Sequence, residues 1–273
     1  MTTTPYRHHD TPRARRLARE RNTTSAAPVQ PRIERLSRRR RVIAERMHRS
    51  LQETAQLTTV IEVDLSREVA IREAAKDAFR LRYGASLSVL AFVAEAAVQA
   101  LGGHPVINAE LDLAAGTISY PLSVGLGIAV DTDEGLVVPV IRDAGSLTVG
   151  GLARRIAELA TRARNGSATA DDFAGGSFTI TNTGSRGALF DTPILNSPQS
   201  AILGLGAVVR RPVVLPGGNG DEVIAIRSMA YLSLTYDHRL VDGADAARYL
   251  TSVRTRLESG PVGAELLSGV SQT

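Results

Sequence analysis

Helical and strand-like stretches follow one another irregularly along this chain, and this order constrains its fold more than any other sequence feature. Helical patterns cover residues 36–53, 67–82, 86–101, 148–164 and 244–258. Strand-like patterns cover residues 57–63, 123–130, 136–141, 177–183, 200–209 and 223–236. Because the two types lack the regular alternation of a parallel sheet, the sequence predicts an α+β fold with a large mixed β-sheet flanked by helices.

The helix predicted at 36–53 carries an apolar stripe. Its apolar side chains recur at helical spacing and are Leu36, Val42, Ile43, Met47 and Leu51. A helix on the surface of a globular protein turns such a stripe towards the core. We therefore expect these five side chains to be buried.

Positive charge is concentrated at the N-terminal end. Residues 1–49 contain fourteen arginines and four acidic residues, whereas the whole chain has a net charge of +4. Residues 1–31 also lack hydrophobic periodicity, which predicts a basic, largely disordered arm before a folded domain at 32–273. Aromatic residues are few and no nucleic-acid recognition motif follows, so the arm fits solvent or another subunit better than nucleic acid.

What the sequence lacks narrows the class of protein. No run of eighteen apolar residues is present, so no membrane span is expected. The N-terminus has no apolar signal segment, and the absence of cysteine excludes disulfides and a cysteine nucleophile, both in agreement with the cytoplasm. His8, His9 and His48 have no metal-ligand spacing to any partner, so no metal is expected.

A histidine follows directly on the strand predicted at 223–236. The sequence there reads Asp237-His238-Arg239-Leu240-Val241-Asp242-Gly243, and the last predicted helix comes next. Catalytic groups are often placed where a rigid strand gives way to a loop. Histidine changes its charge near neutral pH and can take a proton from a thiol. His238 is therefore a candidate general base.

Less specific explanations exist for the same residues. Asp242 precedes a helix and Asp245 stands three residues further on, a pattern typical of an N-cap with an acidic first turn. His238 can equally be a turn histidine bonded to the backbone. Spacing alone leaves these explanations open.

The strand predicted at 177–183 is rich in hydroxyl groups and flanked by glycines. Hydroxyls on a rigid strand, such as that of Thr181, can donate to an oxyanion that forms at a thioester carbonyl. Threonine and isoleucine are also simply good strand formers, so the pattern alone favours a structural explanation. Gly204-x-Gly206 lacks the third glycine of a dinucleotide-binding turn and is interpreted as a packing feature.

Taken together, these segments resemble the catalytic domain of the dihydrolipoamide acyltransferase component of 2-oxoacid dehydrogenase complexes. The resemblance is carried, in order, by residues 36–47, 56–64, 104–109, 126–132, 135–141, 177–182, 198–204 and 236–243. Residues 181–191 look like the actinobacterial branch of that family.

The resemblance implies a chloramphenicol-acetyltransferase-like fold assembled as trimers, with each active site at a subunit interface. It also implies that His238 deprotonates the attacking thiol, that Thr181 stabilises the oxyanion, and that Asp242 organises the site. An arginine of the first helix, one of residues 38–41 or Arg46, is expected to pair with Asp242. Coenzyme A and dihydrolipoamide are expected as substrates that enter from opposite ends of a channel.

Two departures from the family pattern concern partners. Typical members carry lipoate on a lysine at a hairpin tip, whereas Lys76 is the only lysine here and has a helical context. We therefore expect a separate lipoyl-bearing protein to supply lipoate in trans. Residues 11–20 resemble only the first helix of the family's peripheral-subunit-binding domain, which weakens the case for the usual docking of dehydrogenase subunits.

The sequence leads to three functional hypotheses. The first is an acyltransferase between dihydrolipoamide and coenzyme A, with acetyl favoured over succinyl and branched-chain groups. The second is an enzyme of the same fold that acts on another carrier thiol. The third is a non-catalytic trimeric scaffold of a dehydrogenase complex. The polar residues 264–273 are consistent with an isolated trimer, but trimer and larger core both stay open.

Overall fold

The structure is a computed structural model that describes residues 33–133, 135–218 and 220–266. The described residues from Arg38 to Leu266 belong to one structural unit. The arm expected at 1–31 lies outside the described residues, as do residues 267–273 at the C-terminal end.

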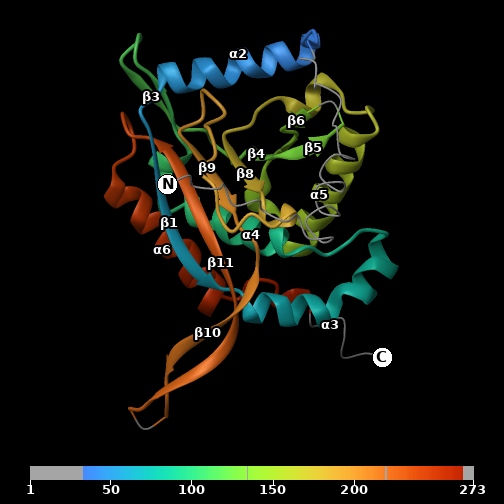
Figure 1. The fold of residues 1–273 in the computed structure, drawn as a ribbon, viewed down its shortest axis with the longest axis vertical. Coiled ribbons are helices and arrows are strands. Elements are labelled where there is room, and N and C mark those ends of the chain that lie inside the picture. The colour runs from blue at the N-terminus through green and yellow to red at the C-terminus, as the bar shows by residue number, and fades with distance from the viewer. Residues whose placement is uncertain (1–32, 134, 219, 267–273) are drawn as a thin grey trace, which may run out of the picture. The chain divides into compact units, whose positions relative to one another are not determined.

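A seven-stranded sheet forms the centre of this unit (Figure 1). Its strands are β1 (Gln56–Asp64), β4 (Leu126–Ile128), β7 (Val140–Ile141), β8 (Phe178–Asn182), β9 (Ala201–Leu205), β10 (Val209–Pro216) and β11 (Glu222–Asp237). The order across the sheet is β1-β11-β9-β8-β4-β7, with β10 paired to β11. Strand β8 runs parallel to both of its neighbours, β4 and β9, whereas the other pairs are antiparallel. The predicted mixed sheet is confirmed.

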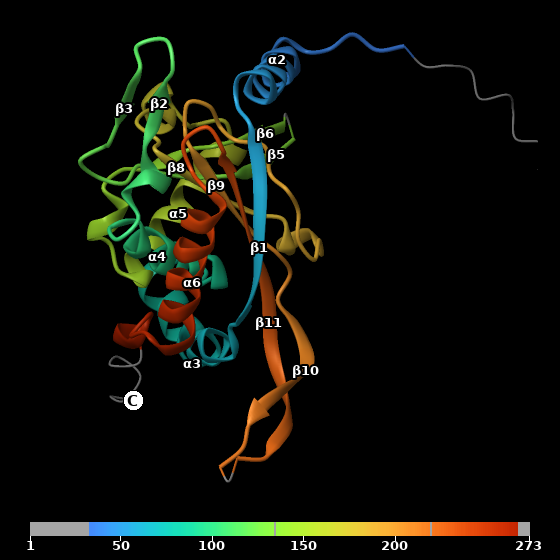
Figure 2. The same ribbon diagram turned by 90° about the vertical axis from the view of Figure 1, so that its left-hand side faces the viewer.

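Four helices lie together on one side of the sheet (Figure 2). They are α3 (Ser66–Tyr83), α4 (Val89–Leu101), α5 (Val149–Arg164) and α6 (Gly243–Ser259). Helix α4 is almost wholly apolar and buried, because it packs against both α5 and α6. Inward-facing residues of the strands, such as Ile180, Leu203 and Leu234, complete the core. Among the described residues, no helix combines the length and apolar character needed to cross a membrane.

The region predicted as two strands at 123–130 and 136–141 is divided more finely. Besides β4 and β7 it contains β5 (Val130–Thr132) and β6 (Gly135–Val137), which form a separate two-stranded ribbon. Pro139 has no N–H to donate, so a continuous ladder through this segment is interrupted there. Its carbonyl still accepts a hydrogen bond from Ile128 N at 2.9 Å. A second small hairpin joins β2 (Glu110–Asp112) to β3 (Thr117–Ser119).

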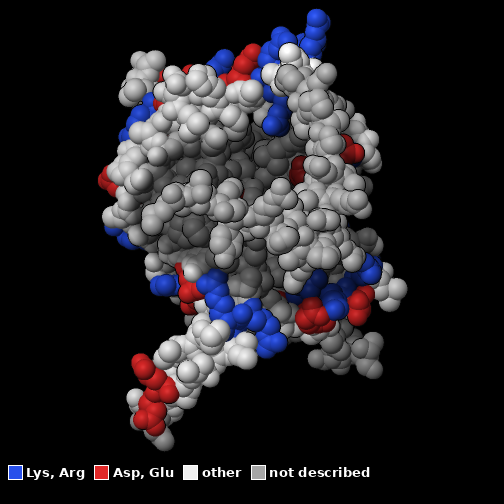
Figure 3. Space-filling model, in the orientation of Figure 1, with Lys and Arg blue, Asp and Glu red and all other residues white. Residues whose placement is uncertain are grey.

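Strand β10 was not predicted, because Pro212 and Pro216 interrupt its strand pattern. It is an edge strand that pairs only with β11, where a missing N–H can face outward. Acidic side chains gather at the tip of this hairpin and basic ones at its base (Figure 3). At the base, Arg211 and Arg227 are register partners, and Glu62 and Asp64 of β1 form ion pairs with them.

The first helix is observed as α2 (Arg38–Glu53), but its expected burial is wrong. Leu36, Val42 and Leu51 are exposed, whereas Ile43 and Met47 are half-buried. The only buried residue within α2 is Ser50. Helix α2 lies at one end of the sheet rather than in the layer of four helices, so the described part of the chain leaves its apolar stripe uncovered (Figures 1 and 2).

Candidate active site

His238 follows directly on the last residue of β11. Its backbone N–H donates to the carbonyl of Ala55 at 2.8 Å, which ties the residue to the start of β1. The side chain is exposed, and its ring centroid lies 5.8 Å from that of buried Tyr236. A long, rigid strand therefore presents an accessible imidazole at its end, as the sequence predicted.

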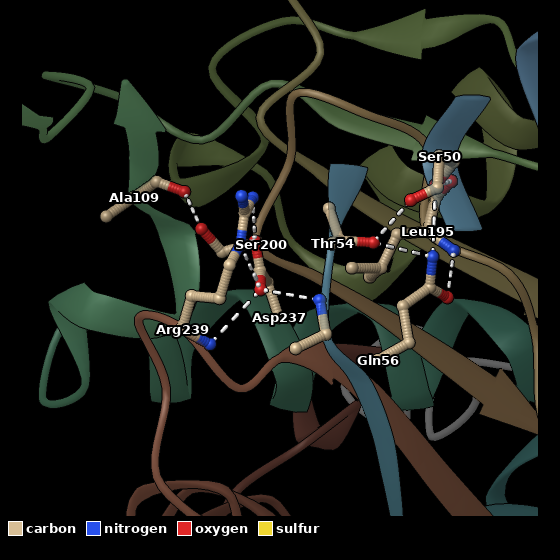
Figure 4. Close-up of polar contacts among 9 residues, drawn as sticks. Ser50, Thr54, Gln56, Ala109, Leu195, Ser200, Asp237 and Arg239 are labelled. Atoms are coloured by element: carbon tan, nitrogen blue, oxygen red, sulfur yellow. Dashed lines mark hydrogen bonds and ion pairs between the residues drawn. The ribbon is translucent and has the colours of Figure 1, made fainter. Parts of the chain in front are cut away.

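Asp237 anchors the turn that carries His238. Its side chain lies inside, and its Oδ1 accepts hydrogen bonds from Ala55 N at 3.2 Å and from Arg239 N at 3.1 Å. The Arg239 guanidinium adds a bidentate ion pair, with Nε 3.0 Å from Oδ1 and Nη2 2.7 Å from Oδ2 (Figure 4). One carboxylate thus fixes both the backbone directly after the histidine and the residue before β1.

The charge of Asp237 is stabilised by these contacts. Burial tends to raise the pKa of this carboxyl, but hydrogen bonds from the Arg239 side chain, the Arg239 backbone and the Ala55 backbone outweigh it. The pKa of Asp237 consequently lies below its ordinary value. Sequence reasoning missed this residue; the available signal was an acidic residue directly before the motif histidine.

A second set of polar contacts joins α2 to the segment before β9 (Figure 4). Ser50 Oγ donates to the carbonyl of Leu195 at 2.8 Å, and Gln56 Nε2 donates to Ser50 Oγ at 3.1 Å. Gln56 Oε1 in turn accepts from Leu195 N at 3.1 Å. Each of these buried groups has a partner, so the surroundings of the His238 turn are fixed in one arrangement.

Asp242 occupies the N-cap position of α6 and forms a capping box with Asp245. The helix-cap explanation offered by the sequence is therefore confirmed. Within the described residues no ion pair connects Asp242 to an arginine of α2, and the motif arginine Arg239 binds Asp237 instead. The pairing of Asp242 with the first helix stays a prediction.

Thr181 lies on β8 and is the register partner of Gly204 on β9. Gly204 is in turn the partner of Ser233 on β11. Directly paired residues point to the same face of a sheet, so Thr181, Gly204 and Ser233 share the face opposite the helical layer. The Thr181 side chain is half-buried, and its hydroxyl has no hydrogen-bond partner among the described residues.

One chain does not bring Thr181 and His238 together. They are separated by two strand spacings across the sheet and by the five residues from Ser233 to His238 along β11. At about 4.8 Å per strand and about 3.3 Å per residue, this amounts to roughly 20 Å. A base and an oxyanion donor that act on one carbonyl must lie within a few ångströms of it.

Two clefts lie beside the turn at Ser197-Pro198. One, of about 670 Å³, is lined by Asp237, Arg239 and Glu110. The other, of about 440 Å³, is lined by Arg46, Arg49 and Gln199. Within the described ranges no group of three or more histidine or acidic side chains is arranged to hold a metal ion.

Comparisons with known proteins agree on one family. The chain is 51% identical over 250 residues to the dihydrolipoyllysine-residue acetyltransferase component of the pyruvate dehydrogenase complex of Mycobacterium bovis. It is 44% identical over 225 residues to the succinyltransferase component of the 2-oxoglutarate dehydrogenase complex of Bartonella vinsonii. These matches cover 92% and 82% of this chain but only 44% and 53% of the relatives, so it spans about half of their length.

A solved structure is similar as well. The cubic core of a pyruvate dehydrogenase multienzyme complex matches with a TM-score of 0.80 and 32% identity, over 89% of this chain and 97% of that one. Residues 29–263 match the family described as 2-oxoacid dehydrogenases acyltransferase (catalytic domain). The chain therefore belongs to this family of acyltransferase catalytic domains.

Proposed function

We propose that this protein transfers an acyl group between dihydrolipoamide and coenzyme A, with His238 as general base, Thr181 as oxyanion donor and Asp242 as the residue that organises the site. The observation that carries the proposal is the His238 turn, where buried contacts fix the backbone that carries an exposed imidazole at a strand end. A histidine held at this strand end by a buried carboxylate network favours catalysis over a purely structural scaffold.

The reaction exchanges one thioester for another. The unprotonated imidazole of His238 takes the proton of the coenzyme A thiol, and the thiolate attacks the carbonyl carbon of the acyl-dihydrolipoamide thioester. A carbon–sulfur bond forms, and the carbonyl oxygen becomes an oxyanion to which the Thr181 hydroxyl donates. Collapse of this intermediate breaks the original carbon–sulfur bond. The dihydrolipoamide thiolate then takes the proton back from His238.

The site is proposed to form between two copies of the chain. His238 and Thr181 of one chain are roughly 20 Å apart by strand register, which supports a site made of His238 from one copy and Thr181 from another. The uncovered apolar stripe of α2 supports burial against a second copy. A head-to-tail contact of this kind can close into a ring. The family resemblance sets our proposal at a homotrimer, either isolated or joined into a larger core.

The acyl carrier is proposed to bear its lipoyl group on a lysine other than Lys76. That residue lies within helix α3, and its Nζ forms an ion pair with Glu73 Oε2 at 2.5 Å. A separate lipoyl-bearing protein remains our proposal for the donor, and dehydrogenase subunits for further partners. Acetyl is the favoured acyl group because the mycobacterial relative is named as an acetyltransferase, and the Bartonella relative makes succinyl the alternative.

The test measures acyl transfer from acetyl-CoA and from succinyl-CoA to free dihydrolipoamide. We expect turnover by the wild type, with acetyl-CoA preferred, and a loss of about a thousandfold in kcat for His238→Ala. Thr181→Val should lose about a hundredfold, as removal of one oxyanion donor does. Arg186→Gln, which alters only a surface ion pair with Asp131, is the control and should keep the wild-type rate. Equal rates for wild type and His238→Ala would falsify the assigned base.

A further inference from the structure

The cleft of about 440 Å³ beside helix α2 has no role in the steps above. Helix α2, which lies across one end of the sheet, forms one of its walls (Figure 1). Residues 196–199, which lead into β9, form another, and Gly175, Gly176 and Val140 line the rest together with their neighbours. Small-molecule sites in proteins typically measure about 300–1,000 Å³. The cleft is therefore large enough for a small ligand.

Two arginines of α2 line this cleft. Arg46 and Arg49 stand three residues apart, so their side chains lie on the same face of the helix. Neither side chain forms an ion pair or a hydrogen bond among the described residues. Arginines of other elements do, as Arg162 does with Asp172. The two guanidinium groups are therefore available to a negatively charged ligand.

A buried amide opens onto the same cleft. Gln199 is only 3% exposed, and its Oε1 accepts a hydrogen bond from Thr179 Oγ1 at 2.6 Å. The Thr179 hydroxyl is buried and has no other acceptor among the described residues, so the oxygen of the amide faces it. Gln199 Nε2 donates to no described residue, yet it does not belong to the polar atoms that are sealed from solvent. Because Gln199 lines the cleft, this amide nitrogen is directed into it.

Gly176 keeps the amide nitrogen accessible. A Cβ at this position would stand 3.0 Å from Val140 Cγ2 and 3.1 Å from Gln199 Nε2, closer than side chains normally approach. Any larger residue would therefore crowd the donor that faces the cleft.

The charge of the cleft is positive. Among the described residues that line it, Glu53 alone is acidic. Glu53 also lines the neighbouring cleft that contains Arg239. The pKa of Arg239 is raised by its hydrogen bond to Asp237, and the charges of Asp237 and Glu53 add to this effect. Glu53 is thus partly compensated by Arg239, whereas Arg46 and Arg49 have no such partner.

We propose that this cleft is a binding site for a phosphate group, held by the guanidinium groups of Arg46 and Arg49 and by the amide N–H of Gln199. Guanidinium groups match the oxygens of a phosphate in geometry and charge, and hydrogen bonds to such an anion are stronger than those between neutral groups. Val138 and Phe173 provide an apolar wall for the uncharged part of a small phosphorylated molecule.

The phosphate site is distinct from the acyl-transfer site of the same chain. Neither His238 nor Thr181 lines the cleft. The carbonyl of Ser200, the residue after Gln199, accepts a hydrogen bond from Asp237 N at 2.9 Å, so an occupant lies beside the His238 turn. The phosphate can come from coenzyme A or from a separate phosphorylated molecule. The site therefore stands whether or not the proposed acyl transfer does.

The experiment titrates the full chain with inorganic phosphate by isothermal titration calorimetry, in a phosphate-free buffer at constant ionic strength. We expect one saturable site per chain in the wild type. Arg46→Gln and Arg49→Gln should each weaken the affinity about tenfold or more, because each removes a charge-assisted hydrogen bond. Both side chains are exposed, so the fold should be kept. Arg186→Gln removes the same charge from a surface ion pair with Asp131, and as the matched control it should keep the wild-type affinity.

Two further variants test the buried amide. Gln199→Glu keeps an acceptor for Thr179 Oγ1 but replaces the N–H donor by a negatively charged oxygen, so phosphate binding should be lost. Gly176→Ala leaves all the binding groups in place and should weaken the affinity by a smaller factor, because its methyl group crowds Nε2. Thermal denaturation checks that each variant is folded. If Gln199→Glu does not fold, the two arginine variants decide.

Competition identifies the source of the phosphate. Coenzyme A and dephospho-coenzyme A differ only in the 3′-phosphate. If coenzyme A displaces inorganic phosphate better than dephospho-coenzyme A does, the occupant is the 3′-phosphate of the substrate, and if both displace it equally, the occupant is the diphosphate. If inorganic phosphate binds unchanged to protein saturated with coenzyme A, the occupant is a separate phosphorylated molecule.

Two results would overturn the phosphate site. The first is the absence of a saturable site in the wild type. The second is an affinity that Arg49→Gln and Gln199→Glu leave unchanged, which would mean an adventitious ion only, bound to other basic residues. A wild type that binds phosphate in the cleft but shows no acyl transfer would refute the proposed function and leave this site standing.

Discussion

The two halves of the proposed site differ in how completely their polar groups are paired. Beneath the His238 turn the buried polar side chains are paired: Asp237 binds Arg239 and Ala55, and Ser50 binds Leu195. Around Thr181 the pairing is less complete, because Ser233 Oγ is buried without a hydrogen-bond partner among the described residues, and burial raises the pKa of the Asp191 carboxyl despite its hydrogen bond to Thr183. Both halves lie on the same sheet, so the difference comes from side chains rather than from strand geometry.

The comparison indicates that the two halves of the site have different roles. A general base must be held in one orientation before substrate arrives, and a satisfied network of hydrogen bonds provides this rigidity. A surface that receives a substrate or a second subunit instead gains affinity from groups that are paired only in the complex. The His238 half therefore corresponds to preorganised catalytic machinery, and the Thr181 half to a surface that is completed on binding.

The largest expected effect comes from inactivating the His238 half in one chain and the Thr181 half in another. His238→Ala and Thr181→Val should each be nearly inactive alone, by about a thousandfold and about a hundredfold. Co-expressed with different affinity tags and purified through both tags, mixed trimers should regain about a third of wild-type activity, because one of the three head-to-tail sites in each mixed ring unites an intact His238 with an intact Thr181. Mixed oligomers no more active than either variant would refute a site shared between copies.

The next largest effect is on stability and compares Asp237 with Asp242, the two aspartates of the His238 motif. Asp237→Ala removes one partner of a buried ion pair and leaves Arg239 uncompensated, so it should lower the free energy of unfolding by about 2–3 kcal/mol, allowing for the partial exposure of Arg239. Asp242→Ala removes only a helix cap, worth about 1 kcal/mol. Urea titrations of both variants measure the difference. Equal losses would mean that Asp237 does not anchor the turn.

The Asp237 carboxylate also predicts how the stability of the fold depends on pH. Because the folded-state pKa of Asp237 is lowered, its stabilisation is complete above the unfolded-state value of about 3.9 and is lost as the pH falls through the folded-state pKa. The wild type should therefore lose stability below about pH 4 more steeply than Asp237→Ala. Thermal melts between pH 3 and 6 test this, with Ser233→Ala, which removes no ionisable group, as the control that retains the wild-type steepness.

The smallest expected effect is the difference in stability loss between alanine substitutions at two buried serines. Ser50 bonds to Leu195 and Gln56, so Ser50→Ala should destabilise the fold by about 1–2 kcal/mol. Ser233 is equally buried but has no partner for its hydroxyl among the described residues, so Ser233→Ala should be neutral or slightly stabilising. Denaturation midpoints of the two variants provide the measurement. If Ser233→Ala lowers the free energy of unfolding as much as Ser50→Ala does, the Ser233 hydroxyl is hydrogen-bonded and the Thr181 half is as completely paired as the His238 half.

Local patterns predicted most helices and strands correctly. The apolar spacing of α5, with Leu152, Ile156 and Leu159 on one face, matches its buried side. Strand β10 was missed because two prolines obscure an edge strand whose outer N–H groups need no partner. The burial of the α2 stripe was predicted wrongly because periodicity shows that a helix has an apolar face but not what covers that face.

The sequence by itself determined the α+β class, the His238 motif at a strand end and the hydroxyl-rich strand of Thr181, and it offered the cap at Asp242 as one explanation, because each depends on residues close together in the chain. Only the tertiary structure decided that Asp237 anchors the His238 turn, that Asp191 lies over Gly204, and that His238 and Thr181 are far apart within one chain. These features depend on the register between remote strands, such as β1 and β11, which side-chain packing fixes and local propensity does not.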